Sequence, residues 1–189
     1  MPEIQLHTPL AAVADLPLQG REVEIRELPV QGHVNLRGDA SQGGFADAVF
    51  AVSGVTLPAA ASTASALQPP CALWLGPGEW LLRLPGEADA ASAVAGLEAA
   101  LGGHFHAAND VSSAQTVLRL EGPRTREVLS KGCTLDLHQR VFAAGQCAQT
   151  NLAQTVVVLM PVDDLGGIDV IVRRSFADYL ARWLLDACR

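Results

Sequence analysis

The sequence contains few charged side chains and no long apolar run. Only 17% of its 189 residues are charged, whereas 49% are hydrophobic. No stretch approaches the roughly 18 consecutive apolar residues that a membrane-spanning helix needs. Residues 1–20 lack the basic and continuous apolar regions of a secretory signal peptide. We therefore expect a cytoplasmic protein without a membrane partner, and surplus apolar surface on a domain of this size favours contact with another protein.

Basic side chains are scarce as well. Lys and Arg together number 13 against 20 Asp and Glu, so the net charge is −7. Basic residues cluster only at Arg124 with Arg126 and at Arg173 with Arg174. A nucleic-acid-binding protein normally carries an extended basic stripe, so the composition argues against nucleic acid as a partner.

The common catalytic and cofactor motifs are missing. The sequence contains no Gly-x-Gly-x-x-Gly fingerprint, phosphate-binding loop or Ser/His/Asp arrangement. Its four cysteines (Cys71, Cys133, Cys147 and Cys188) form no CxxC pair and have no short, even spacing. In a cytoplasmic chain we expect them to be reduced, mostly buried thiols. The residues alone predict no catalytic, cofactor-binding or metal site.

Weaker candidates each have a simpler structural interpretation. His104 and His106 fall on a predicted strand, residues 104–108, and could form half of a metal site; without further ligand spacing we favour solvent-facing histidines. Asp163 and Asp164 could act as an acid–base pair, but they precede Leu-Gly-Gly, which favours a solvated turn.

A thiolate pair is a further candidate. Cys147 could pair with His138, yet nine residues of loop fix no geometry between them, and a structural thiol in a strand is the favoured interpretation.

Two tryptophans and two arginines are candidates for binding. Trp74 and Trp80 flank a Gly-Pro-Gly hairpin turn and could stack a flat heterocycle, although packing against a helix is commoner. Arg173 and Arg174 precede a predicted helix, where positive charge is disfavoured. We expect these arginines to pair with acids of a partner. Pairing within the chain, with Asp136 or Asp169, is the alternative.

Alternation and turn residues predict an α+β fold. Residues 1–20 are expected to form an extended N-terminal arm and residues 21–189 a single domain. The low-complexity residues 58–70 should form a mobile or poorly ordered surface connector. The predicted strands are 23–27, 33–37, two runs within 71–84, 104–108, 116–120, 146–151, 155–160 and 168–172; the predicted helices are 41–52 (N-cap Ser41), 89–101, 123–131 and a last one opened by a capping box, Ser175 with Asp178.

The order strand–turn–helix occurs twice. The second unit has Gly122 as N-cap and Gly132 as a left-handed C-cap. The two units close alike, with Gly-Val-Thr-Leu at 54–57 and Gly-Cys-Thr-Leu at 132–135. We therefore expect two pseudo-symmetric β-α-β-type half-modules, about 21–108 and 109–189. Residues 30–101 should superpose on residues 114–187 through a pseudo-twofold axis.

The order of several motifs along the chain carries a family resemblance. The motifs lie at residues 73–82, 110–112, 117–124, 131–138, 145–150, 172–177 and 183–187. Together they closely resemble the gamma subunit of bacterial heterotetrameric sarcosine oxidase over nearly everything after residue 20. The family usually has an acid where Gly78 stands and often a histidine where Ser113 stands.

The second half also resembles, more distantly, the folate-binding domain of the glycine-cleavage aminomethyltransferase. In that broader family a hairpin presents an acid to folate. Here the hairpin is cut back to residues 151–155 and the acid is absent. The resemblance thus implies a folate-binding aminomethyltransferase-like fold without the folate role, and Asp163 and Asp164 fall one strand too late to supply it.

The resemblance to the gamma subunit implies the following function. The complex converts sarcosine to glycine, passes the one-carbon unit to tetrahydrofolate and produces hydrogen peroxide. Its FAD, FMN, NAD and folate sites belong to the larger chains, and the partners of this chain are the alpha, beta and delta subunits. This chain is then a non-catalytic subunit that packs against the folate-binding part of alpha, with Arg173, Arg174, Trp74 and Trp80 as expected interface residues. A stand-alone folate-binding or aminomethyltransferase-like protein and a pure interaction domain are the alternatives.

Overall fold

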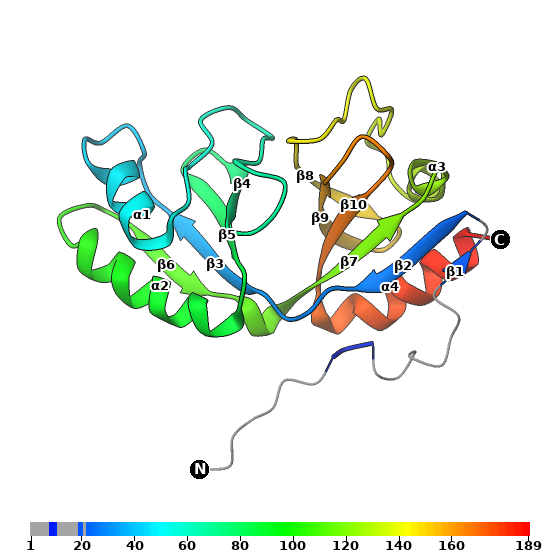
Figure 1. Ribbon diagram of the computed structural model, residues 1–189, viewed down its shortest axis with the longest axis horizontal. Coiled ribbons are helices and arrows are strands. Elements are labelled where there is room, and N and C mark those ends of the chain that lie inside the picture. Colours follow the sequence, from blue (N-terminus) through cyan, green and yellow to red (C-terminus); the bar gives the residue numbers. More distant parts are fainter. Residues whose placement is uncertain (1–7, 11–18, 21) are drawn as a thin grey trace, which may run out of the picture.

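Two antiparallel β-sheets with helices on their outer sides make up the fold (Figure 1). The computed structural model describes residues 8–10, 19–20 and 22–189, so most of the predicted arm at residues 1–20 lies outside the described residues. Within that arm, Leu10 is buried in the core of the second sheet. The mixed α and β composition predicted from the sequence is confirmed.

The first sheet has four strands in the order β4-β5-β3-β6. Helix α2 lies under it in Figure 1. Its elements are β3 (Gly32–Arg37), α1 (Phe45–Ser53), β4 (Cys71–Gly76), β5 (Glu79–Leu84), α2 (Glu87–Ala100) and β6 (Ala107–Asp110).

The second sheet has six strands in the order β1-β2-β7-β10-β9-β8. Helix α4 lies under it, in line with α2 (Figure 1). Its elements are β1 (Gln19–Gly20), β2 (Val23–Glu27), β7 (Gln115–Glu121), α3 (Thr125–Ser130), β8 (Ala148–Leu152), β9 (Thr155–Pro161), β10 (Ile168–Arg173) and α4 (Arg174–Ala187).

The chain begins in the second sheet, forms the whole first sheet, and then returns to the second. Strand β2 immediately precedes β3 in the chain but pairs with β7, whereas β6 precedes β7 but pairs with β3. The two connections pass one another in the middle of Figure 1. They are also bonded, because His33 donates its N–H to Ser112 Oγ at 2.9 Å and accepts from the Val111 N–H at 2.8 Å. The first sheet is therefore built from one continuous stretch, residues 32–110, whereas the second sheet combines β1 and β2 with the strands that follow residue 114.

The order β4-β5-β3-β6 has a counterpart in β9-β10-β7-β2. Each set contains a first strand followed by a short helix, then a hairpin, then a long helix. The superposition of residues 30–101 on 114–187 stays a prediction. The predicted boundary between residues 108 and 109 falls inside β6, a strand that belongs to the first sheet.

Alternating side chains divide the core into three layers. On β5, Trp80, Leu82 and Leu84 face α1 and α2, whereas Leu81 packs toward the other sheet. The same period-2 alternation places one face of the second sheet against α3 and α4. The layer between the sheets contains Leu28, Cys71, Leu73, Leu81, Val117, Cys147, Val158, Met160, Val162 and Ile171.

A buried ionic cluster crosses this middle layer. Arg83 on β5 donates through Nη2 to Asp169 Oδ2 on β10 at 2.9 Å. Arg119 on β7 donates to the same carboxylate at 2.6 and 3.0 Å. Arg83 and Asp169 are both fully buried, and Gln31 Oε1 accepts further bonds from Arg83. One carboxylate thus ties the two sheets together.

The predicted helix starts need correction. Helix α1 begins at Phe45, with Gly44 as N-cap, instead of at Ser41. The reason is local, because both the N–H and the hydroxyl of Ser41 donate to Asp39 Oδ1 in a preceding turn. Helix α4 begins at Arg174 directly after β10, so Ser175 lies inside the helix and the predicted capping box is wrong.

The turn around α3 also differs from the prediction. The helix begins at Thr125 with Arg124, not Gly122, at the N-cap position. It ends at Ser130, and the C-cap is Lys131 in a right-handed conformation, so Gly132 is not a left-handed cap. Gly132 instead lies against Trp183, where a Cβ would come within 2.5 Å of the indole ring.

Residues 58–70 are more structured than the predicted mobile connector. Thr63 forms a bridge with Gln146 and Ala64 forms one with Leu73. Ser62 O accepts the Cys147 N–H at 2.9 Å. Leu73 belongs to the first sheet, whereas Gln146 and Cys147 lie just before β8 of the second. The segment therefore contacts both sides of the fold.

Candidate functional site

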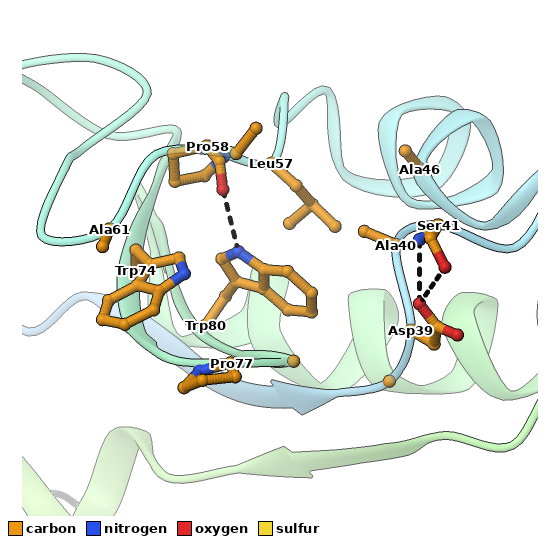
Figure 2. A pocket seen from close by; sticks show the side chains of 13 residues that line it. Asp39, Ala40, Ser41, Ala46, Leu57, Pro58, Ala61, Trp74, Pro77 and Trp80 are labelled. Carbon is orange, nitrogen blue, oxygen red and sulfur yellow. Dashed lines mark hydrogen bonds between the residues drawn. The ribbon is translucent and has the colours of Figure 1, made fainter.

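One candidate site in the described part of the chain is a hollow beside the β4–β5 hairpin (Figure 2). Trp74 and Trp80 are partners across this hairpin. Trp80 is 4% exposed, and its indole Nε1 donates to Pro58 O at 3.2 Å. Its ring also packs against Phe45, with centroids 6.4 Å apart. Trp80 therefore forms the floor of the hollow, and the half-buried Trp74 forms part of its wall.

The hollow has a volume of about 770 Å³. It is lined by Gly38, Asp39, Ala40, Ser41, Ala46, Leu57, Pro58, Ala59, Ala61, Trp74, Pro77, Gly78 and Trp80. The bonds from Ser41 lower the pKa of Asp39, so this carboxylate is a weak base that orders its loop. The lining suits apolar or aromatic contact with one negative charge at the rim.

Gly78 fixes the hairpin against the loop after β3. It has a left-handed φ of 67°, and a Cβ there would lie 2.5 Å from Gly38 O. Gly38 donates its N–H to Gly78 O at 3.0 Å. A side chain at this position would be both strained and crowded, which accounts for glycine in this chain.

The two histidines do not share a strand face. Strand β6 begins at Ala107, so the predicted strand at 104–108 is wrong. His104 packs edge-on against Phe45 and contacts Gln42, whereas His106 lies 3.5 Å from a Glu98 carboxylate oxygen. Among the described residues, no group of three His, Cys, Asp or Glu side chains could hold a metal ion.

The candidate thiol is also structural. Cys147 is buried and donates to Thr63 O and Trp74 O, at 3.3 and 3.4 Å. Burial raises its pKa to about 11, which disfavours a thiolate. His138 instead accepts the Arg140 N–H through Nδ1. Cys71 has the same elevated pKa for the same reason.

The two aspartates form a turn. Asp163 Oδ1 accepts the N–H groups of Leu165 and Gly167, each at 2.8 Å. Asp164 is exposed beside it. Both residues lie in the connection from β9 to β10, which agrees with the predicted turn.

Of the two arginines, Arg173 is exposed and Arg174 is half-buried. Asp169 is bound by Arg83 and Arg119. Pairing of the two arginines with acids of a partner, or internally with Asp136 or Asp169, stays a prediction. These positions lie at the junction of β10 and α4, away from the residues that line the hollow.

Sequence reasoning missed the charged cluster and its neighbour His33. His33 is Arg83's partner across β3 and β5. Burial, followed by the charge of Arg83, lowers the His33 pKa to about 3, so the ring is neutral. The sequence contained a signal that Arg83 is buried, because apolar residues on both sides of it indicate a strand that is buried on both faces.

The fold has a known class. An aminomethyltransferase of the glycine cleavage system from Bartonella henselae matches with a TM-score of 0.60 and 16% identity, over 94% of this chain and 49% of that chain. At this identity the likeness shows a shared fold alone.

No helix in the described part of the chain is long and apolar enough to cross a membrane.

Closer similarity identifies the family. Residues 37–189 match the family model described as sarcosine oxidase, gamma subunit family. Sarcosine oxidase gamma subunits from Corynebacterium sp. strain P-1 and from Arthrobacter sp. are each 34% identical, over 95% of this chain and 88% of theirs. A chain of heterotetrameric sarcosine oxidase from Corynebacterium sp. U-96 matches with a TM-score of 0.86 and 31% identity, over 97% of this chain and 94% of that chain. This chain belongs to the sarcosine oxidase gamma subunit family.

Proposed function

We propose that this chain is a non-catalytic subunit of a cytoplasmic, heterotetrameric sarcosine oxidase. The observation that carries the proposal is the match to a chain of such an enzyme, at a TM-score of 0.86 over 97% of this chain. A match over this share of the chain spans both sheets. A chain that keeps the whole subunit fold is expected to keep the assembly that the subunit serves.

In this proposal the chemistry belongs to the other chains. The larger subunits hold FAD, FMN, NAD and tetrahydrofolate, and the complex converts sarcosine to glycine with release of hydrogen peroxide. The polar groups of this chain support a structural role. Asp169 pairs with two buried arginines, Asp163 orders a turn, and the Cys147 thiol is buried with a raised pKa.

Packing against the folate-binding part of alpha is the finer part of the proposal. The fold that this chain shares with an aminomethyltransferase supports it. The folate-binding part of alpha is expected to have the same fold, so the interface would join two domains of similar shape. Arg173 is exposed at the β10–α4 junction and is suited to a partner acid. Replacing Arg173 or Arg174 by Ala should weaken assembly more than it lowers the free energy of unfolding.

A stand-alone folate-binding protein is the second candidate, because the shared fold is that of a folate-related enzyme class. The β8–β9 hairpin argues against it. Its strands are joined by Ala153 and Gln154 alone, and these residues contact Gly132 O and the Tyr179 hydroxyl. No acid stands at the tip. Titration of the isolated chain with tetrahydrofolate should give no saturable binding; micromolar binding would favour this second function.

We also infer that the fold arose from two related halves. The matching strand orders β4-β5-β3-β6 and β9-β10-β7-β2 support this. A rotation near 180° should superpose residues 30–101 on residues 114–187; a fit that aligns α1 with α4 instead of α3 would contradict the duplication.

The experiment for the main proposal is co-purification. The tagged chain is co-expressed with the alpha, beta and delta subunits from the same source and purified through the tag. We expect one copy of each chain in the product, with flavin absorbance and peroxide formation from sarcosine. Recovery of the tagged chain without the other three would refute the assembly.

A further inference from the structure

Most of the net negative charge lies in one part of the chain. Residues 38–115 contain seven Asp and Glu side chains and a single Arg or Lys, which is Arg83. Arg83 is fully buried and bound to Asp169, so it does not offset the surface charge. The nearest preceding base, Arg37, is paired with Glu79 at 3.1 Å. The surface of the first sheet and its helices is therefore acidic.

One large apolar side chain stands out from this acidic surface. Phe105 is 92% exposed. Its neighbours hold the backbone in place, because His104 packs edge-on against Phe45 and His106 contacts Glu98 and the His104 carbonyl. The phenyl ring is thus presented to solvent by a segment anchored on both sides. An exposed aromatic ring held in this way is typical of an interaction site.

Phe105 borders a second hollow next to the tryptophan hollow. This second hollow has a volume of about 590 Å³. The two hollows share Gly38, Asp39, Pro77 and Gly78, so they lie on either side of the fixed hairpin turn. We define the hairpin-tip groove as these two hollows together, with Trp74 at one end and Phe105 at the other. Asp39 is exposed between them.

We propose that the hairpin-tip groove binds a basic segment of another subunit of the complex. An apolar side chain of that segment packs between Phe105 and Trp74, and a Lys or Arg lies near Asp39. The inference rests on the proposed function, since it requires a partner subunit. Charge complementarity selects the occupant, because the surrounding surface repels nucleic acid and acidic segments.

A second copy of this chain is a poorer occupant. Its residues 116–189 carry nine basic and eight acidic side chains, so they offer almost no net positive charge to the groove. Trp74 adds a further preference for a basic segment, since a guanidinium or ammonium group is attracted to an indole face.

The test compares two equally exposed positions. Phe105→Lys removes the ring and adds a positive charge in the groove, and Leu165→Lys makes the same kind of change at the β9–β10 turn, where Leu165 is 87% exposed. Each tagged variant is titrated against a preparation of the alpha, beta and delta chains, and its fold is checked by thermal unfolding. We expect Phe105→Lys to weaken binding by about tenfold or more and Leu165→Lys to change it by less than about twofold.

Salt provides the second readout. Raising the salt concentration from ~0.05 to ~0.5 M should weaken binding of the wild-type chain. Asp39→Asn, which keeps an oxygen acceptor for Ser41, should reduce that salt dependence. Unchanged binding of Phe105→Lys, or equal losses for both Lys variants, would overturn the groove proposal while the wild-type complex still forms. Failure of the wild-type chain to bind would refute the proposed function instead. A groove-dependent homodimer, detected by light scattering and broken by Phe105→Lys, would overturn the choice of occupant.

Discussion

Replacing Asp169 by Asn should destabilise the fold severely. The Asp169 carboxylate accepts bonds of 2.6 to 3.0 Å from Arg119 and Arg83, two guanidinium groups that belong to different sheets. Asparagine keeps the shape but removes the charge and turns an N–H₂ donor toward a guanidinium. Arg83 is 0% exposed, so water cannot replace the lost partner.

The magnitude follows from breaking a buried ion pair, which costs about 3–5 kcal/mol when one charge is left without its partner. A domain has only about 5–15 kcal/mol of total stability. For a domain of this size, about 2–4 °C of Tm is lost per kcal/mol, so the melting temperature should fall by roughly 6–20 °C.

Urea unfolding of the isolated chain measures this free energy directly. The matched control is Asp178→Asn, which removes an exposed helical pair with Arg182 and should cost less than about 0.5 kcal/mol. A loss below about 1 kcal/mol for Asp169→Asn, with an unchanged slope against urea, would refute the role of the cluster in joining the sheets.

Three further outcomes follow from buried groups and close contacts. The pKa of His33 is lowered from 6.5 to about 3 in the folded protein, so the unfolded chain takes up a proton first as the pH falls. The free energy of unfolding should therefore drop by up to about 1.4 kcal/mol per pH unit between about pH 6.5 and 3. Replacing His33 by Gln should remove this slope. All four thiols should titrate in denaturant without reductant, with Cys71 and Cys147 the slowest to react in the native protein since burial raises each pKa to about 11; fewer than four would indicate oxidation. Gly122→Ala should cost more than about 1 kcal/mol, because Gly122 has a φ of 133° and a Cβ would lie 2.1 Å from Glu22 O, whereas Gly43→Ala, which meets nothing within 4 Å, should be nearly neutral.

Local patterns in the sequence predicted the strands well. The β4–β5 hairpin and strand β10 were found because period-2 alternation and glycine turns depend on near neighbours alone. Helix starts were harder to predict, since a capping residue can be engaged elsewhere. Ser41 illustrates this, because Asp39 binds both of its donors before the helix begins.

Pairings between distant strands could not be predicted. Nothing in β2 itself indicates that it pairs with β7, about 90 residues away, instead of with the neighbouring β3. Arg83 was missed for a related reason, since its partner Asp169 lies on another sheet. The groove at the hairpin tip likewise depends on the contact between Gly38 and Gly78, two residues forty positions apart.

The central claim is that this chain is a structural member of an oxidase complex, without cofactor or turnover of its own. Purification of the isolated chain, followed by an absorption spectrum and a peroxide assay with sarcosine, tests it most directly. We predict a colourless preparation that forms no peroxide until the alpha, beta and delta chains are added. A flavin absorbance band, or peroxide formation by the isolated chain, would contradict the account.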